Sequence, residues 1–338
     1  MNDIKIDVVN DIFFGDSGKG QITQQLSLLS SQNKYTHCIR YNGGANAGHT
    51  VYVDGKKIVT HIVPTGIVNG LKCIIGNGCV LNVEGFFKEL KELEDAGIQT
   101  KNKVFISRAC HIVTDAHLEE EKNETTIGTT KRGIGPCYRD KILRTGIRAE
   151  SIPELQPYLI DMYHEFYEVP GSKYILAEGA QALGLDIDLG DYPFVTSSNC
   201  GIGAVLNNGF NHKHINKVYS VAKVYTTYVG SKKFHSSDPI FDKIQLAGKE
   251  FGATTGRKRQ CNLLNIDQLV KGANILGTTT LVLTKLDIFE EVNFFRYLYG
   301  EVEFDFDNVQ SFKESLVRVL QKELGPIEII FTTRPVGF

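Results

Sequence analysis

The 338-residue sequence contains no tryptophan, 2 methionines and 9 prolines, and it has no excess of either charge. Its 37 Lys and Arg residues stand against 39 Asp and Glu residues, which gives a net charge of −2. Because a broad basic face is needed to grip nucleic acid or an anionic membrane, this balance excludes a protein of that kind. It leaves room for small basic pockets.

Long apolar runs and cysteine motifs are also missing. No stretch approaches the length that spans a bilayer, and residues 1–9 lack the apolar core of a signal peptide. The 7 cysteines are odd in number, widely spread and without a CxxC pair, which is typical of free thiols in a reducing compartment. We therefore expect a soluble, cytoplasmic protein. Hydrophobic content of 42% and charged content of 22% exclude a disordered or fibrous chain.

Short apolar segments alternate with helix-like segments, a pattern typical of an α/β fold with a predominantly parallel central sheet flanked by helices. We expect strands at residues 4–9, 72–75, 103–106, 174–177, 218–224, 280–283 and 327–331. Helices are expected at residues 21–29, 83–96 and 312–324, and a hairpin at 292–306. Residues 115–150 are polar and loop-like, which predicts a functional loop. With no repeat and no clean linker, residues 1–338 are predicted to form one domain with loop and small helical excursions.

The first candidate site is the glycine loop at residues 15–20, Gly-Asp-Ser-Gly-Lys-Gly, between a predicted strand and a predicted helix. Such a loop turns backbone N–H groups toward phosphate, and Lys19 adds a point charge. The spacing is not that of a Walker A motif. A carboxylate beside phosphate, here Asp16, is repelled unless a cation or a proton transfer is involved. A simple glycine turn with a solvated lysine is the alternative.

Two further segments combine small and polar residues. Residues 42–50 contain Asn46, Gly48, His49 and Thr50, and His49 could donate a proton or hydrogen bond to a phosphoryl group. Residues 127–136, which include Thr130, are followed by basic residues that suit a monophosphate. Those basic residues are Arg139, Lys141 and Arg144. The alternatives are a structural histidine and a flexible basic loop.

Two later segments suit anionic groups and a base. Residues 251–259 carry three adjacent cations, Arg257 to Arg259, which repel one another unless an anion binds. Thr284–Asp287 follows a predicted strand, and a carboxylate there can accept hydrogen bonds from guanine while repelling adenine N1. Gln181, after another predicted strand, could contact a base or an oxyanion. His212 and His214 lack a supporting ligand cluster and are interpreted as solvated histidines.

In this order, seven segments resemble the adenylosuccinate synthetase family. They are residues 15–20, 46–50, 127–130, 178–181, 192–199, 252–259 and 284–287. The resemblance implies a P-loop-NTPase-like fold and an enzyme of purine nucleotide biosynthesis. Such an enzyme ligates IMP and L-aspartate to adenylosuccinate with GTP and Mg²⁺, through a 6-phosphoryl-IMP intermediate, and releases GDP and phosphate.

The resemblance also implies a role for each matching residue. The catalytic residues would be Asp16 as the base, His49, Lys19 and Gln181, with Asp16 and Gly48 as Mg²⁺ ligands. GTP would be bound by Gly15, Ser17, Gly18, Lys19, Gly20, Gly48, His49, Thr50, Arg259, Lys285 and Asp287. IMP would be bound by Asp16, Asn46, Thr130, Arg144, Gln181, Thr196, Val229 and Arg257. L-Aspartate would be bound by Thr254, Thr255, Arg257 and Arg259. Arg144 would complete the neighbouring site, which implies a homodimer.

Several positions depart from the family's pattern. Ser17 stands where glutamate is usual, Tyr228 where arginine is common, and residues 331–335 lack the usual Ser-Thr-Gly-Pro near guanine. The chain is a compact form, shorter between 148 and 174 and after Asp287. A viral relative, which makes 2-aminoadenylosuccinate from deoxyguanylate, carries serine at the position of Asp16, so Asp16 favours IMP. That viral activity and a non-catalytic guanine-nucleotide switch are the alternatives.

Overall fold

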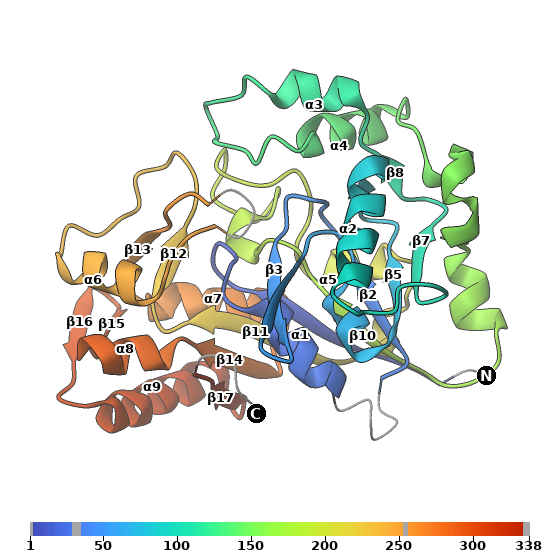
Figure 1. The fold of residues 1–338 in the computed structure, drawn as a ribbon. Helices are drawn as coiled ribbons and strands as arrows, with labels where there is room; N and C mark the ends of the chain where they lie inside the picture. The colour runs from blue at the N-terminus through green and yellow to red at the C-terminus, as the bar shows by residue number, and fades with distance from the viewer. Residues whose placement is uncertain (1–2, 29–34, 253–255, 334–338) are drawn as a thin grey trace.

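A nine-stranded sheet forms the centre of the computed structural model, which describes residues 3–28, 35–252 and 256–333 (Figure 1). The strand order is β17-β14-β11-β1-β10-β2-β5-β7-β9, and every neighbouring pair is parallel. The strands are β1 (Ile4–Asp11), β2 (His37–Arg40), β5 (Lys72–Ile75), β7 (Val104–Ser107), β9 (Leu159–Ile160), β10 (Lys173–Glu178), β11 (Ile215–Lys223), β14 (Thr280–Thr284) and β17 (Glu328–Phe331). The predicted parallel sheet is confirmed.

Helices cover both faces of this sheet because its strands are apolar on both sides. On β1, Val9 packs in the same cluster as α1 (Lys19–Leu28) and α2 (Val83–Asp95), whereas Val8 packs with α5 (Ile202–Leu206). At the β14–β17 end lie α7 (Ile266–Leu276), α8 (Leu286–Val292) and α9 (Val309–Leu324) (Figure 1). The sheet is therefore the middle layer of three, the arrangement expected from the alternating pattern.

Local helix signals in the sequence agree with the observed boundaries. The Asn82 side chain accepts a hydrogen bond of 2.8 Å from the backbone N–H of Gly85, which caps α2. Asn308 caps α9 in the same way through Ser311, at 2.9 Å. The helix predicted from Gln21 begins two residues earlier, at Lys19, because the glycine loop merges into its first turn. Leu29, Thr254, Thr255, Arg334 and Pro335 lie outside the described residues.

Two predictions of local structure were wrong in part. Residues 115–150 contain α3 (Asp115–Glu121) and α4 (Ile134–Leu143), so only the segment between the helices is a loop. Ile134 and Tyr138 bury one side of α4 against Val80 and Val113. The sequence did not predict this helix because it has too few apolar positions at helical spacing. The hairpin is shorter than predicted, since α8 continues to Val292 and the strands are β15 (Arg296–Tyr299) and β16 (Val302–Asp305).

The remaining elements are short and surround the sheet. Two-stranded pairs form between β3 (His49–Val53) and β4 (Lys56–Thr60), β6 (Val80–Leu81) and β8 (His111–Ile112), and β12 (Thr226–Tyr228) and β13 (Gln260–Asn262). The short helices are α6 (Ile240–Ala247), η2 (Thr65–Asn69), η3 (Ala149–Ser151), η4 (Pro153–Tyr158), η5 (His164–Glu168), η6 (Leu183–Leu185) and η7 (His212–His214). All seven cysteines are free, as predicted, and all are buried. Within the described ranges, no helix has both the length and the apolar character to cross a membrane.

The carboxyl ends of five neighbouring strands place polar residues along one edge of the sheet. These ends are Asp11 on β1, Arg40 on β2, Glu178 on β10, Lys223 on β11 and Thr284 on β14. In open α/β sheets, ligands bind at this edge, where the chain leaves the sheet in opposite directions on either side of a central strand. The candidate site lies here.

Candidate active site

Two pockets open side by side at the carboxyl edge of the sheet and share four residues. With their open mouths they enclose about 1070 Å³ and about 1320 Å³. Asp16, Lys19, Gly48 and His49 line both pockets. A group bound in one pocket can therefore meet a group bound in the other at these four residues.

Most of the residues selected from the sequence line one pocket or the other. The first pocket contains Gly15, Asn46, Thr130, Gln181, Thr196, Val229 and Arg257. The second contains Ser17, Gly18, Gly20, Thr50, Arg259 and Lys285. Arg144 lies at the exposed end of α4 and lines neither pocket, and Asp287 lies in the first turn of α8, outside the lining of both. Thr254 and Thr255 are not among the described residues.

The glycine loop between β1 and α1 takes a conformation that L side chains rarely adopt. Its φ angles are +86° at Gly15, +59° at Asp16 and +108° at Gly18. Gly20 is required for a different reason, because a Cβ atom there would lie 2.7 Å from the Cβ of His49. The loop therefore brings the start of α1 directly against His49, at the boundary between the pockets.

Asp16 is held by an arginine from the opposite wall. The Arg259 Nε donates to Oδ2 of Asp16 at 2.8 Å, and Nη1 of Arg259 donates to Glu250 at 2.5 Å. Burial raises the pKa of Asp16, but the positive charges of Arg259, Lys223 and Lys19 outweigh it, so the pKa is lowered. The positive charges thus favour the ionised form of Asp16, and an anion that drew Arg259 away would make Asp16 a stronger base.

A buried ion pair fixes Arg259 from behind. Lys223, at the end of β11, donates to Oε2 of Glu250 at 2.8 Å, and the Tyr225 hydroxyl donates to Oε1 at 2.6 Å. Burial raises the pKa of the Glu250 carboxyl, yet Lys223 and Arg259 lower it to about 2. Glu250 therefore stays charged and orients Arg259 toward the shared part of the pockets.

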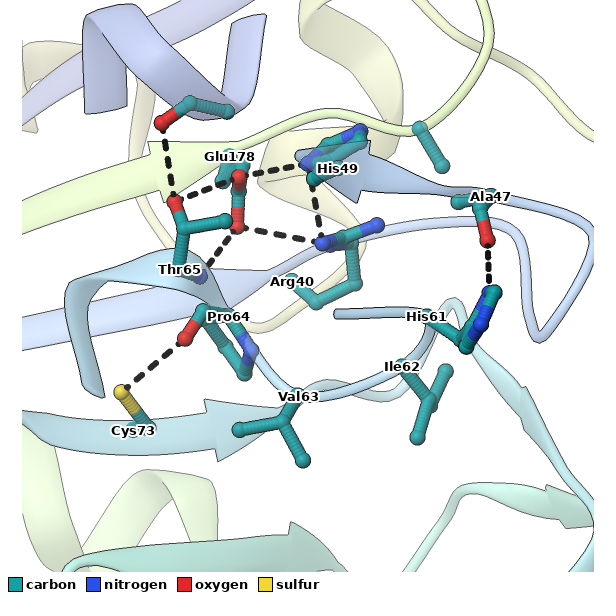
Figure 2. A network of polar contacts seen from close by, with 12 residues as sticks. Arg40, Ala47, His49, His61, Ile62, Val63, Pro64, Thr65, Cys73 and Glu178 are labelled. Carbon is teal, nitrogen blue, oxygen red and sulfur yellow. Dashed lines mark hydrogen bonds and ion pairs between the residues drawn. The ribbon is translucent and has the colours of Figure 1, made fainter. Parts of the chain in front are cut away.

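His49 is oriented by a buried carboxylate on β10, as Figure 2 shows. Its Nδ1 lies 2.6 Å from Oε1 of Glu178, whose other oxygen accepts from Arg40 at 3.1 Å. Thr65 donates to the same carboxylate through its backbone N–H, at 2.9 Å, and through its hydroxyl, at 2.8 Å. These donors come from β2, β3 and η2, so the Glu178 carboxylate links three segments to the end of β10.

The electrostatics of this group favour the neutral form of His49. Burial and the nearby Arg40 guanidinium lower the pKa of His49 to about 4, against the opposing effect of Glu178. Burial raises the pKa of Glu178, but Arg40 and His49 prevail and lower it to about 2. Because an ionised carboxylate can only accept, Nδ1 carries the proton and Nε2 is left for the pocket. An anionic phosphoryl group nearby raises the pKa of His49 and favours its protonated, donating form.

These shifts predict loss of stability in acid. Relative to usual values of 6.5 and 4.5, the folded pKa values of His49 and Glu178 are depressed, so the unfolded chain binds protons first. The unfolding temperature is expected to fall as the pH drops from about 6.5 toward 4 and further toward 2. In His49→Gln the upper part of this fall should shrink, as measured by calorimetry against His212→Gln. An unchanged pH profile in His49→Gln would contradict the assignment.

Gln181 projects into the first pocket from the turn after β10. Its φ angle is +57°, and its buried Oε1 has no hydrogen-bond partner among the residues that the structure describes. Arg257 reaches the same pocket and donates to the backbone oxygen of Gly128 at 2.9 Å. A strained backbone with an unsatisfied buried polar atom is a feature of ligand sites, so Gln181 is suited to bind a polar ligand group.

Sequence reasoning missed the residues that support the site from beneath. Asp11, Arg40, Lys223 and Glu250 received no role, and Glu178 was noted only as part of a motif. A usable signal existed for Asp11 and Lys223, because they lie at the ends of β1 and β11, both of which the sequence predicts as strands, and ligand residues often follow strand ends. Arg40 had no such signal, because its strand was not predicted. Glu250 had no signal, because nothing in the sequence shows that it pairs with Lys223, which lies 27 residues earlier.

An open parallel sheet with a phosphate-type loop after its central strand is the architecture of nucleotide-binding α/β enzymes. Comparison with known proteins shows which family within this class the chain resembles. The adenylosuccinate synthetase family profile matches residues 8–155 and 149–297. The adenylosuccinate synthetase of Vibrio cholerae serotype O1 strain M66-2 is 38% identical, over 82% of this chain and 76% of its own length. That of Lodderomyces elongisporus is 34% identical, over 97% of this chain and 88% of its own. The chain belongs to the adenylosuccinate synthetase family.

Solved structures agree with this assignment. A fully ligated adenylosuccinate synthetase from Plasmodium falciparum superimposes with a TM-score of 0.82 at 26% identity, over 98% of each chain. The succinoaminodeoxyadenylate synthetase of cyanophage S-2L, bound to dGMP and dATP, gives a TM-score of 0.70 at 18% identity, over 94% of this chain and 100% of that one. The second likeness shows the fold alone. The expected fold class and the resemblance found in the sequence are both confirmed.

Proposed function

We propose that this enzyme uses GTP to ligate IMP and L-aspartate to adenylosuccinate, with release of GDP and phosphate, at the junction of the two pockets. The observation that carries the proposal is the sharing of Asp16, Lys19, Gly48 and His49 by both pockets. IMP occupies the first pocket and GTP the second. This arrangement lets the γ-phosphoryl group of GTP meet the 6-oxygen of IMP.

Phosphorylation of IMP comes first in this proposal. The 6-oxygen of neutral IMP is a poor nucleophile, so Asp16 takes the N1 proton and an oxyanion forms. The oxyanion attacks the γ-phosphorus and the bond to the GDP oxygen breaks. Lys19 and the glycine-loop amides stabilise the charge on the phosphoryl oxygens, while the Gln181 amide binds at the 6-oxygen. His49 donates a hydrogen bond to the transferring group once its Nε2 is protonated.

Mg²⁺ fits this site only together with phosphate. In the part of the chain that the structure describes, no group of three or more His, Cys, Asp or Glu side chains is arranged to hold a metal ion by itself. Mg²⁺ in nucleotide sites commonly takes one or two carboxylates and completes its shell with phosphate and water oxygens. Asp16 and the Gly48 carbonyl are the oxygen donors that would hold it here, and when bound it neutralises charge on the nucleotide phosphates.

L-Aspartate takes part in the second step. Its amine attacks C6, the C–N bond forms, and the C6–O bond breaks so that phosphate leaves with the former 6-oxygen of IMP. Thr254, Thr255, Arg257 and Arg259 are the proposed binding residues for its carboxylates. Because Arg259 donates to Asp16, a substrate anion that attracts Arg259 would also weaken its hold on the base.

A direct assay separates this function from its alternatives. Purified protein is supplied with L-aspartate, GTP and Mg²⁺ and either IMP or dGMP, and products are identified by mass spectrometry. We expect adenylosuccinate from IMP at a rate far above any product from dGMP. Preference for dGMP would support the viral activity instead. GTP binding without either product would indicate a nucleotide switch.

We further propose that Lys285 and Asp287 select guanine. Lys285 lines the second pocket and its Nζ donates to the Gly248 carbonyl at 3.0 Å, which holds its stem along the wall. Asp287→Ala removes a charged acceptor for the guanine N1–H and amine, so the preference for GTP over ATP in kcat/KM should fall about 10–100-fold. Glu290→Ala, an exposed change on the same helix, is the control. An unchanged GTP preference in Asp287→Ala would refute this role.

Arg144 is proposed to act in the neighbouring subunit of a homodimer. It is exposed at the end of α4 beside Ile142, Leu143 and Ile147, which are 75%, 59% and 44% exposed. Such an apolar patch supports self-association. If Arg144 acts across the interface, mixing equal amounts of inactive Arg144→Leu and Asp16→Asn subunits should restore about a quarter of wild-type activity. About half of the dimers are then mixed, and each mixed dimer has one intact site out of two. Each variant mixed with itself is the control, and no recovery would contradict action across the interface.

A further inference from the structure

Asp11, the last residue of β1, accepts hydrogen bonds from three donors of the glycine loop. Its Oδ2 lies 3.0 Å from Nζ of Lys19 and 3.2 Å from the backbone N of Ser17, and its Oδ1 lies 3.1 Å from Oγ of Ser17. The Asp11 side chain is fully buried, and the Lys19 side chain is 3% exposed. One carboxylate therefore fixes both the middle of the loop and the lysine at its end.

The loop has a particular need for this contact. Gly15 and Gly18 adopt positive φ angles without strain, but the positive φ of Asp16 is unfavourable for a residue with a side chain and persists only where surrounding contacts determine it. Lys19 also needs a partner, because a buried ammonium without a counter-charge is strongly destabilising. Its long stem has many rotamers, and the bond to Asp11 selects one in which Lys19 lines both pockets.

Ser17 binds Asp11 through both its hydroxyl and its N–H, so a carboxylate placed at position 17 would lie close to the one on β1. We propose that Asp11 positions Lys19 for phosphoryl transfer. Asp11 lines neither pocket, so it acts through Lys19 and Ser17 rather than on the substrate. The catalytic part of this inference rests on the proposed function.

The test compares Asp11→Asn with a matched control on the same strand. Asp7 is also a buried carboxylate of β1, and it accepts from Tyr35 and Asn216, far from the pockets. Asp11→Asn should weaken GDP binding in calorimetry and lower kcat/KM for GTP by about tenfold or more, with KM for IMP little changed. Asp7→Asn should leave these constants unchanged even where it lowers the unfolding temperature.

Relocating the charge makes the test specific. Asp11→Ala should weaken GDP binding and lower turnover, and adding Ser17→Glu to it should recover at least half of the loss on a logarithmic scale. Wild-type constants in Asp11→Asn, an equal loss in Asp7→Asn, or no rescue by Ser17→Glu would overturn the proposal. If Asp11→Ala alone does not fold, a double variant that folds and binds GDP supports the proposal for Asp11. If neither the single nor the double variant folds, the proposal is refuted. GDP affinity is read without turnover, so failure of the proposed ligase activity is seen separately.

Discussion

Asp16→Asn is expected to lower kcat by about 10²–10⁴-fold, the usual range for loss of a general base. Asparagine keeps the size of the side chain and a hydrogen-bonding oxygen, but it cannot take the N1 proton of IMP. The affinity for GTP should stay comparatively intact, because Lys19 and the loop amides remain. Loss of a Mg²⁺ ligand would add to the effect on turnover.

Steady-state kinetics with IMP, L-aspartate and GTP, together with GDP titration, measure these two quantities. Asp242→Asn is a suitable control, because Asp242 lies on α6 with a side chain that is 72% exposed. A wild-type rate in Asp16→Asn would refute the assigned base. A large loss of GDP affinity at an unchanged rate would show that Asp16 binds nucleotide rather than IMP.

His49→Gln is expected to lower kcat by about 10²–10³-fold, comparable to the loss of one donor that stabilises a transition-state charge. Glutamine fills part of the space, but it cannot be protonated as the phosphoryl group arrives. The effect should fall on kcat more than on KM for GTP, since the donor is needed most in the transition state.

Glu178→Gln is the companion variant for His49. Its amide oxygen can still accept from Nδ1, so turnover should fall less than in His49→Gln. Stability should fall substantially, since Arg40 has no exposure to solvent and loses its charged partner. Pre-steady-state turnover and thermal unfolding separate the two effects. Wild-type kcat in His49→Gln would contradict the role of His49 in phosphoryl transfer.

Elements with strong local signals could be predicted from the sequence. The apolar segment Lys72–Ile75 is a strand with the predicted boundaries, and Asn82 caps its helix as expected. The strand His37–Arg40 was not predicted, because its polar side chains are satisfied by distant partners: His37 by Glu165 and Arg40 by Glu178. The helix α4 was missed because only a few apolar side chains mark its buried side.

The order of the motifs likewise identified most pocket residues but not their pairing. The contact between Glu178 and Arg40 depends on the register of β10 with β2, which aligns residues 138 positions apart. The contact between Asp11 and Lys19 depends on the path of the glycine loop, which positive φ angles set. Asp287 lies in one of the matching segments, and Arg144 was assigned by the resemblance. Neither lines either of the two pockets, so their roles stay predictions.

Transfer of an oxygen atom offers the most direct test of the proposed reaction. IMP labelled with ¹⁸O at the 6-position is incubated with the enzyme, GTP, Mg²⁺ and L-aspartate, and the released phosphate is analysed by mass spectrometry. Phosphorylation of the 6-oxygen, followed by displacement by the aspartate amine, predicts one ¹⁸O atom in each phosphate and none in adenylosuccinate. Unlabelled phosphate formed together with adenylosuccinate would contradict a 6-phosphoryl intermediate formed between the two pockets.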